Sequence, residues 1–195
     1  MEVLKESMLS ISKHISNIAR SLNEKEIVTF ISSMQESNKI FIYGAGRSGL
    51  VAKAFAMRLM HLGFDIYVIG EIITPAIAKN DLLITISGSG ETTSVVAAAE
   101  IAKRANAKVI LITTFPNSTL GKIADSLVVV KGRTKLIGDK NFLLRQIKGE
   151  HYSLAPLGTL FEVAVLIFLD GLVAELMAKL GQSEDDLRTR HATIE

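Results

Sequence analysis

The sequence contains no cysteine, which excludes disulfide bonds and metal sites built on thiolates. Its four histidines stand at positions 14, 61, 151 and 191, without the H-x-x-x-H spacing of a metal-binding helix. Long apolar runs are also missing. The most apolar region, 154–180, is interrupted by Glu162, Asp170 and Glu175, and it lacks the ~20 uninterrupted apolar residues of a membrane span. No apolar segment follows the charged first residues, as a secretory signal would require. We therefore expect a cytoplasmic protein with no metal and no membrane partner.

A strong charge of either sign is lacking as well. The formal net charge is +2, and the lysines and arginines are scattered along the chain. Without a basic stripe, we expect no nucleic-acid partner. The 195 residues, 48% of them hydrophobic and 22% charged, suit one globular domain that buries about 70% of its unfolded surface. We expect residues 1–195 to form that single domain.

Residues 1–38 are predicted to form two N-terminal helices. In the first, apolar residues recur in steps of 4, 3, 4, 3 and 4 and mark one stripe. The stripe consists of Leu4, Met8, Ile11, Ile15, Ile18 and Leu22. Such heptad spacing suits packing onto the domain or a helix–helix seam between subunits, and both alternatives stay open here. The second helix is expected over 24–36, with Asn23 as its N-cap and Glu26 completing a capping box.

Residues 39–131 change to short runs rich in Ile and Val, separated by segments of helical periodicity, notably 48–62 and 92–105. The runs are Lys39–Tyr43, Asp65–Ile69, Leu82–Ile86, Val109–Thr113 and Leu127–Lys131. Strands that are apolar on both faces and alternate with helices predict a parallel sheet covered on both sides. We therefore predict an α/β fold, a Rossmann-like, doubly wound three-layer αβα sandwich with a five-stranded parallel sheet. Its ligand site is expected beyond the carboxyl ends of the strands.

The remainder, 132–195, is predicted to be a long polar connection over 132–153 and a C-terminal part over 154–195. Pro156 is expected to open an apolar helix over 156–180 that ends at Gly181. The tail from Ser183 to Glu195 is consistent with a last helix or with an arm onto a neighbouring subunit.

The loop after the first predicted strand has the pattern G-x-G-x-x-G from Gly44 to Gly49, and Glu71 follows at roughly the spacing of a dinucleotide-binding fold. Two features count against a dinucleotide. Arg47 and Ser48 within the loop offer a cation and a hydroxyl for phosphate or sugar oxygens. Glu71 is also expected in a loop past the second strand. A tight strand-to-helix turn without a ligand is the remaining alternative.

The loop after the third predicted strand indicates the kind of ligand more clearly. It contains two glycines and five hydroxyl residues at the start of a helix: Ser87, Gly88, Ser89, Gly90, Glu91, Thr92, Thr93 and Ser94. Glycines let backbone N–H groups approach an anion, and the helix N-terminus adds partial positive charge. Hydroxyl groups supply further donors. The loop lacks the G-K-[ST] ending of a Walker A motif and contains no G-x-S-x-G nucleophile elbow. We therefore interpret it as a phosphate-binding loop.

This order of motifs, strand–GxGRSG–helix followed by strand–SGSGxT–helix, resembles the sugar isomerase (SIS) domain. The resemblance extends to the 6-phospho-3-hexuloisomerases through segments along most of the chain. They are Gly46–Gly49, Ala56–Gly63, Ser87–Thr92, Pro156–Glu162 and the closing Arg190–Ala192. It implies an SIS-type fold and a homotetramer that uses no cofactor. The implied reaction, in the ribulose monophosphate pathway of formaldehyde metabolism, converts D-arabino-3-hexulose 6-phosphate to fructose 6-phosphate without a metal, through a cis-enediol.

An enediol step needs a base beside the carbon and donors for the oxygens. The resemblance makes Glu162 the candidate base, among the apolar residues that open the last long helix. His61 and His191 are candidate acids, because an imidazole exchanges protons near neutral pH. For this role His191 would have to reach a site, and one in a neighbouring subunit is an alternative. The expected substrate- and phosphate-binding residues are Gly46, Arg47, Ser48, Ser87, Gly88, Ser89, Gly90, Glu91, Thr92 and Thr93.

Three rival functions stay open from the sequence. They are an isomerase for another phosphosugar, a phosphosugar-binding regulator without catalysis, and a nicotinamide-dependent oxidoreductase. Regulators of this type usually add a helix-turn-helix segment, which residues 1–38 are too short and too regularly striped to provide.

Overall fold

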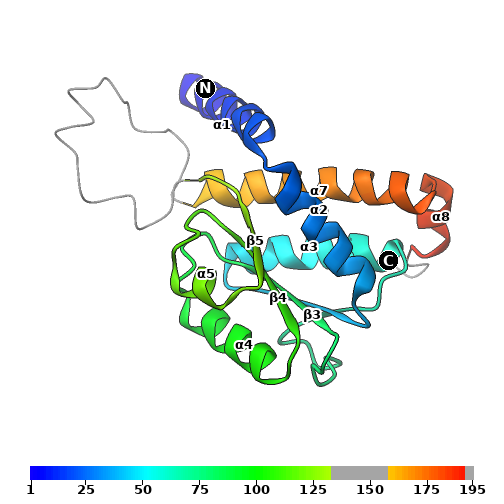
Figure 1. The fold of residues 1–195 in the computed structure, drawn as a ribbon. Helices are drawn as coiled ribbons and strands as arrows, with labels where there is room; N and C mark the ends of the chain where they lie inside the picture. The colour runs from blue at the N-terminus through cyan, green and yellow to red at the C-terminus, as the bar shows by residue number, and fades with distance from the viewer. Residues whose placement is uncertain (133–157, 192–195) are drawn as a thin grey trace.

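The computed structural model of the chain describes residues 1–132 and 158–191. The described residues form a five-stranded sheet in the order β2-β1-β3-β4-β5, and every pairing is parallel. The strands are β1 (Ile40–Gly44), β2 (Ile66–Val68), β3 (Leu82–Ile86), β4 (Lys108–Thr113) and β5 (Ser126–Val129). Helices lie on both sides of this sheet (Figure 1), so the predicted three-layer αβα fold is confirmed.

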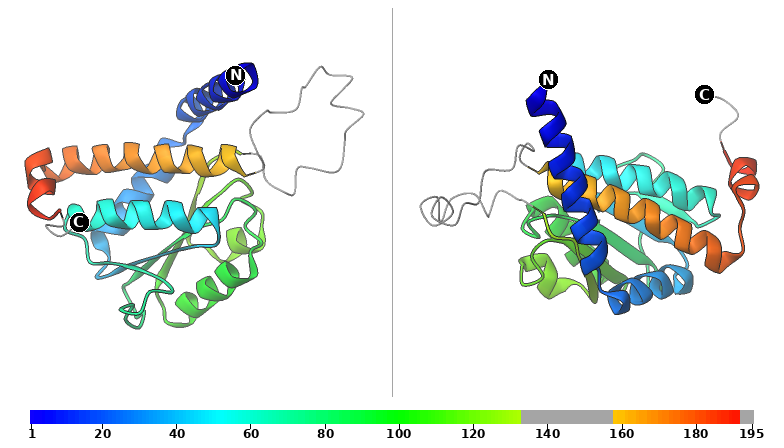
Figure 2. Two further views of the ribbon diagram at one scale, coloured as in Figure 1. Left: turned by 180° about the vertical axis from the view of Figure 1, so that it is seen from behind. Right: turned by 90° about the horizontal axis from the view of Figure 1, so that it is seen from above.

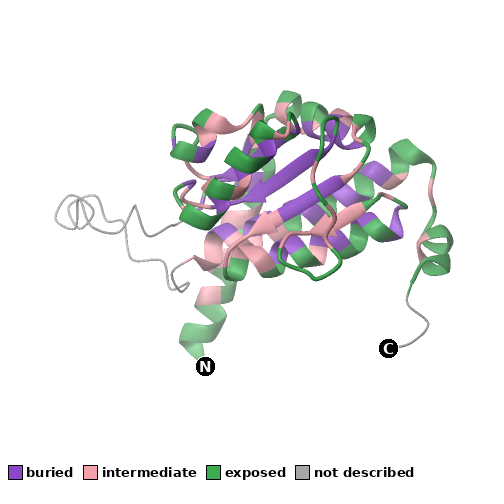
Figure 3. Ribbon diagram, turned by 90° about the horizontal axis from the view of Figure 1, so that it is seen from below, coloured by how far each residue is buried: buried purple, intermediate pink, exposed green. Residues whose placement is uncertain are grey.

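Each face of the sheet has its own apolar core. On one face Ile40 and Ile42 of β1 pack with α1 (Glu2–Ser21), α2 (Glu24–Glu36), α3 (Arg47–His61) and α7 (Thr159–Leu180). On the other, Phe41 and Leu83 pack with α4 (Thr93–Arg104) and α5 (Thr119–Ile123). Figure 3 shows buried strands beneath exposed helical surfaces. Burial on both faces explains why the strands are mostly apolar and do not alternate with polar residues.

The predicted elements match the structure to within a few residues. The third strand has the predicted bounds, and the others shift by one or two residues at an end. The last long helix ends at Gly181, whose φ of 64° is the left-handed conformation expected of a glycine C-cap. The tail forms the short helix α8 (Glu184–Thr189), which Ser183 and Asp186 open with a capping box. The five-residue α5 was not predicted.

The predicted capping box at α2 is only half right. Asn23 does cap the helix, because its side chain accepts the N–H of Lys25 at 3.0 Å. Glu26 does not reach back to the backbone of Asn23. Its carboxylate accepts the side-chain amide of Asn23 at 3.3 Å and the backbone N–H of Val129 on β5 at 3.0 Å. Glu26 therefore ties α2 to an edge strand that would otherwise leave this donor unpaired.

Two helices on the same face position the site. α3 and α7 lie side by side and run in the same direction (Figures 1 and 2). At their starts Arg47 pairs with Glu162, and at their ends the side chain of Gln182 donates to the carbonyl of Leu62 at 3.1 Å. The predicted connection beyond Gly132 and the helix-opening Pro156 lie outside the described residues. No helix in the described part of the chain is long and apolar enough to cross a membrane.

Candidate phosphosugar site at the carboxyl edge of the sheet

The two glycine loops meet at one edge of the sheet. β1 and β3 are neighbours, and Gly44 at the end of β1 is the register partner of Ile86 at the end of β3. The loops that follow, one starting at Gly44 and one at Ser87, therefore leave the sheet next to each other. This edge is where ligands bind in parallel sheets of this type.

The loop after β3 is held by its own hydroxyl groups. Ser87 is 3% exposed, and its Oγ accepts the N–H of Gly90 at 3.1 Å and lies 3.3 Å from the hydroxyl of Thr92. Ser89 Oγ accepts the N–H of Glu91 at 3.2 Å. Gly90 has a φ of 66°, and a side chain there would overlap Ser118, so the turn requires glycine. The chain's own contacts therefore fix the shape of the loop.

The start of α4 offers backbone donors beside this loop. Thr92 is the N-cap residue and makes no side-chain capping bond in the described structure. Thr93 and Ser94, the first residues of the helix, are exposed. Uncapped N–H groups at a helix start, together with the helix dipole, stabilise an anion. The geometry thus suits the phosphate-binding role that the sequence predicted for this loop.

The side chain of Glu91 bonds to α5. Its carboxylate accepts two hydrogen bonds from Thr119 of α5, from the backbone N–H at 2.8 Å and from the hydroxyl at 2.6 Å. The side-chain hydrogen bond from Thr119 is the main cause that lowers the pKa of Glu91 below its usual range. A carboxylate would also repel a phosphate. Glu91 therefore braces the loop against α5.

Ser118 and Thr119 are the supporting residues that the sequence analysis missed. Ser118 caps α5 by accepting the N–H of Gly121 at 3.2 Å, and Leu120 donates its N–H to the carbonyl of Gly90 at 3.0 Å. A signal existed, since both hydroxyl residues follow the carboxyl end of β4, at the same edge as the two glycine loops.

The loop after β1 presents a cation. The backbone N–H groups of Gly49 and Leu50 both bond the carbonyl of Gly46, which sets the first turn of α3. Arg47 stands in this turn, exposed, and its guanidinium Nε bonds the carboxylate of Glu162. In contrast, Glu71 lies in the turn beyond β2 and pairs with Lys53 at 2.6 Å. The acid that a dinucleotide-binding fold would need is thus engaged elsewhere.

Glu162 reaches the same edge from the far end of the sequence. It lies in the first turn of α7, where its N–H bonds the carbonyl of Gly158 at 3.2 Å. That turn also packs closely on Gly132 after β5: a Cβ added to Gly132 would come within 2.6 Å of Phe161 Cα. Contacts with the segments that follow β1 and β5 therefore hold Glu162 at the carboxyl edge of the sheet. Its side chain is 15% exposed, shielded yet open to a ligand.

His61 and His191 lie together, away from the Arg47–Glu162 pair. His61 ends α3, 14 residues after Arg47, which corresponds to about 21 Å along the helix axis. It is buried, and its ring stacks on that of His191 with centroids 5.0 Å apart. Arg190 donates to the carbonyl of His61 at 3.0 Å. The structure thus brings the two histidines together, but at the end of α3 opposite the Arg47–Glu162 pair.

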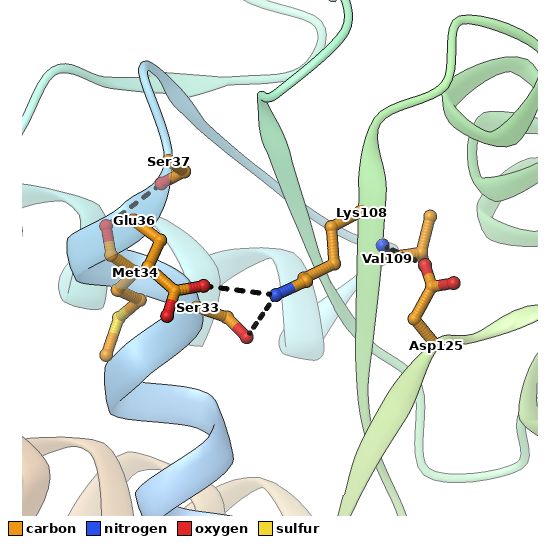
Figure 4. A network of polar contacts seen from close by, with 7 residues as sticks. All are labelled: Ser33, Met34, Glu36, Ser37, Lys108, Val109 and Asp125. Carbon is orange, nitrogen blue, oxygen red and sulfur yellow. Dashed lines mark hydrogen bonds and ion pairs between the residues drawn. The ribbon is translucent and has the colours of Figure 1, made fainter.

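The amino edge of the sheet carries a polar hollow of about 530 Å³. Its charged groups already bond one another: Lys108 Nζ lies 3.2 Å from Ser33 Oγ and 3.6 Å from the carboxylate of Glu36 (Figure 4). Asp125 pairs with Lys103 and accepts the N–H of Val109. No group of His, Asp and Glu that could hold a metal occurs in the described residues. The candidate site is therefore the carboxyl edge.

Known proteins resemble this chain over most of its length. Residues 33–134 match the SIS domain. The chain is 46% identical to an uncharacterised protein of Aeropyrum pernix, over 97% of this chain and 91% of that one. It is 38% identical to the 3-hexulose-6-phosphate isomerase of Bacillus subtilis, over 97% and 98% of the two chains. A crystal structure from Methanococcus jannaschii, for which a molecular function of 3-hexulose-6-phosphate isomerase is inferred, superposes with a TM-score of 0.78 at 34% identity, covering both chains completely.

Proposed function

Because the chain belongs to the SIS domain family, we propose that it is a 6-phospho-3-hexuloisomerase, which interconverts D-arabino-3-hexulose 6-phosphate and fructose 6-phosphate. The observation that carries the proposal is the position of one carboxylate. Glu162 stands beside Arg47 at the carboxyl edge of the sheet, the same edge from which the hydroxyl-rich loop after β3 emerges. A phosphate anchor with a base at hand is what an enediol isomerase of phosphosugars requires.

The substrate phosphate is assigned to the loop after β3. Its oxygens take hydrogen bonds from the hydroxyl groups of Ser89 and Thr92 and from the uncapped backbone of Thr93 at the start of α4. Ser87 and Gly90 hold the loop in shape. Because hydrogen bonds to a charged group contribute about 1.5–3 kcal/mol each, a few of them are enough to anchor the sugar.

The proposed reaction needs one base and balanced proton transfers. The carboxylate of Glu162 takes the proton from C2, the electrons of the broken C–H bond form the C2–C3 double bond, and the C3 oxygen becomes protonated. The resulting cis-enediol then loses the proton of its C2 hydroxyl and receives a proton at C3 from Glu162. Arg47 holds the carboxylate in position and offers a cation to the developing negative charge on oxygen. We propose that no metal or cofactor takes part.

The proposal assigns His61 and His191 to a site shared between subunits of a homotetramer. Within one chain, about 21 Å of helix α3 separates His61 from the Arg47–Glu162 pair. A neighbouring copy that places its exposed His191 over this edge, with buried His61 stacked behind it, supplies the acid for the sugar oxygens. The proposed place of work is the cytoplasm, because a charged sugar phosphate does not cross a membrane unaided, and the proposed pathway is the ribulose monophosphate pathway of formaldehyde metabolism.

The direct test supplies enzymatically made hexulose phosphate and couples the fructose 6-phosphate formed to a dye-linked readout. We expect turnover in the presence of a chelator. Arabinose and heptose phosphates serve as competing substrates, and absorbance at the nicotinamide band reports any oxidoreductase activity. Tight phosphosugar binding without product would refute the isomerase and indicate a regulator. Preferred turnover of another phosphosugar would correct the substrate.

A further inference from the structure

The carboxylate of Glu162 folds back over the residue that begins its own helix. Gly158 is the N-cap of α7, and Glu162 follows about one helical turn later. Because helical side chains lean toward the N-terminus, positions four residues apart share one face. A Cβ added to Gly158 would lie 3.1 Å from Oε1 and 3.3 Å from Oε2 of Glu162. The carboxylate therefore occupies the space that a side chain at position 158 would need.

Gly158 caps α7 without a side chain. Most residues that favour an N-cap carry a side-chain oxygen, which accepts a backbone N–H of the first helical turn. Gly158 makes no such bond, and its φ of 88° lies in the region that favours glycine. The start of α7 thus lacks a side-chain cap and leaves room for the carboxylate of Glu162.

The two oxygens of that carboxylate have different surroundings. Oε2 accepts a hydrogen bond from Nε of Arg47, in the first turn of α3. Oε1 lies nearest to Gly158, and no described residue donates a hydrogen bond to it. Because the bond from a guanidinium stabilises the negative charge on the oxygen that accepts it, Oε1 is the oxygen available for proton transfer.

We propose that Gly158 is a positioning residue of the isomerisation, which leaves Oε1 of Glu162 free to carry the proton between C2 and C3. The inference rests on the proposed function and adds to it the reacting atom and the residue that makes room for it. Oε1 takes the proton from C2, and the electron pair of the broken C–H bond forms the C2–C3 double bond. After the C2 hydroxyl of the enediol has lost its proton, C3 takes the proton back from Oε1.

The fold should tolerate a methyl group at Gly158 better than the reaction does. The added Cβ meets the far end of a long side chain, which can give way by a few tenths of an ångström. Arg47, on the other oxygen, is 59% exposed and can follow. Proton transfer is less tolerant, because a displacement of about 1 Å in a reacting group costs on the order of 100-fold in rate. We therefore expect Gly158→Ala to lower kcat roughly 10-fold and to change KM less than about 3-fold.

The matched control lies at the other end of the same helix. Gly181 has a φ of 64°, and no described atom lies within 4 Å of an added Cβ. Gly158→Ala and Gly181→Ala should therefore lose similar stability in urea unfolding, since both place alanine in a left-handed backbone. Only Gly158→Ala should lower kcat. A much larger loss of stability in Gly158→Ala than in Gly181→Ala would make the contact structural and overturn the proposal.

A double-mutant cycle shows whether Gly158 acts through Glu162. In Glu162→Gln the reacting carboxylate is gone, so adding Gly158→Ala should lower the remaining rate less than about 2-fold. An unchanged kcat in Gly158→Ala, or the same loss with and without Glu162→Gln, would overturn the proposal. If instead the wild type does not isomerise hexulose phosphate, or Glu162→Gln loses no rate, the proposed function itself fails.

A carboxyl signal tests the contact without catalysis. In a chain whose glutamates carry ¹³C at the side-chain carboxyl carbon, the NMR signal of Glu162 is the one missing from Glu162→Gln. Its chemical shift should change in Gly158→Ala and not in Gly181→Ala, because only the first variant places a methyl group 3.1 Å from Oε1. Equal shifts in both variants, or in neither, would contradict the positioning role whatever the chain catalyses.

Discussion

Gly90 is the position where a single methyl group should do the most damage to the phosphate loop. Its φ of 66° is in the left-handed region, and a Cβ built there would lie 1.9 Å from Ser118 Oγ and 2.4 Å from Ser118 Cβ. The overlap cannot be relieved by a flexible chain end, because Ser118 is buried and caps α5 through Gly121. We predict that Gly90→Ala both destabilises the fold and weakens phosphosugar binding.

The magnitude follows from three costs. The left-handed backbone costs a non-glycine residue about 1–2 kcal/mol. Displacing Ser118 from its cap costs about 1 kcal/mol, and overpacking at a buried contact adds about 1–3 kcal/mol. Gly90→Ala should therefore lower the free energy of unfolding by about 3–6 kcal/mol.

Gly181 provides the matched control. It has nearly the same φ, 64°, but no described atom lies within 4 Å of an added Cβ. Gly181→Ala should therefore lose only the backbone cost, about 1–2 kcal/mol. Urea unfolding of both variants at one protein concentration measures the difference, and titration with fructose 6-phosphate measures binding. If Gly90→Ala costs no more than Gly181→Ala and binds the ligand normally, the described contact between the loop and α5 is wrong.

Three further predictions concern the same edge of the sheet. Ser89→Ala should raise KM about 10- to 100-fold, because the phosphate loses a hydrogen-bond donor. Ser87→Ala should also lower the free energy of unfolding, because buried Ser87 accepts the N–H of Gly90. Steady-state kinetics and urea unfolding of the two variants separate these effects. The hydrogen bonds from Thr119 lower the pKa of Glu91, so the ionised carboxylate stabilises the fold at pH values above 4.5, the ordinary pKa of this group. This contribution is lost as the pH falls through the lowered pKa of the folded state. The difference in free energy of unfolding between wild type and Glu91→Gln should therefore shrink in acid, which unfolding measured over a range of pH would reveal. Mixed oligomers of Glu162→Gln and His61→Asn should regain turnover that neither variant has alone, if sites are shared; failure of properly mixed oligomers to regain it would remove His61 from the site.

The sheet was predictable because its strands are buried on both faces. β3 has the predicted bounds, since four of the five residues of Leu82–Ile86 are apolar, all five are buried, and a glycine loop follows directly. α5 was not predictable from periodicity, because it is a five-residue helix held by tertiary contacts: Leu120 bonds Gly90, and Thr119 bonds Glu91. Local patterns do not report such contacts.

The individual residues of the candidate site were predictable, but only some of the contacts between them were. Both Arg47 and Glu162 were candidates, yet their pairing joins residues 115 positions apart and depends on α7 returning beside α3. The distance between His61 and Arg47 is predictable from the sequence, because the two residues are 14 positions apart on one helix. The stacking of His61 on His191 is not predictable in this way, because it depends on the turn between α7 and α8 that brings the tail back to the end of α3.

The central claim is that Glu162 carries the proton between two carbons of a bound phosphosugar. The most direct measurement follows deuterium entering C3 of fructose 6-phosphate in D₂O by NMR, with wild type and with Glu162→Gln under saturating substrate. Because the protonated carboxyl of Glu162 exchanges its proton with D₂O at the enediol stage, the account predicts that the wild type labels C3. The variant should bind the sugar phosphate as tightly as the wild type but label C3 on the order of 100-fold more slowly, or more slowly still. Labelling at an unchanged rate in the variant would contradict the account.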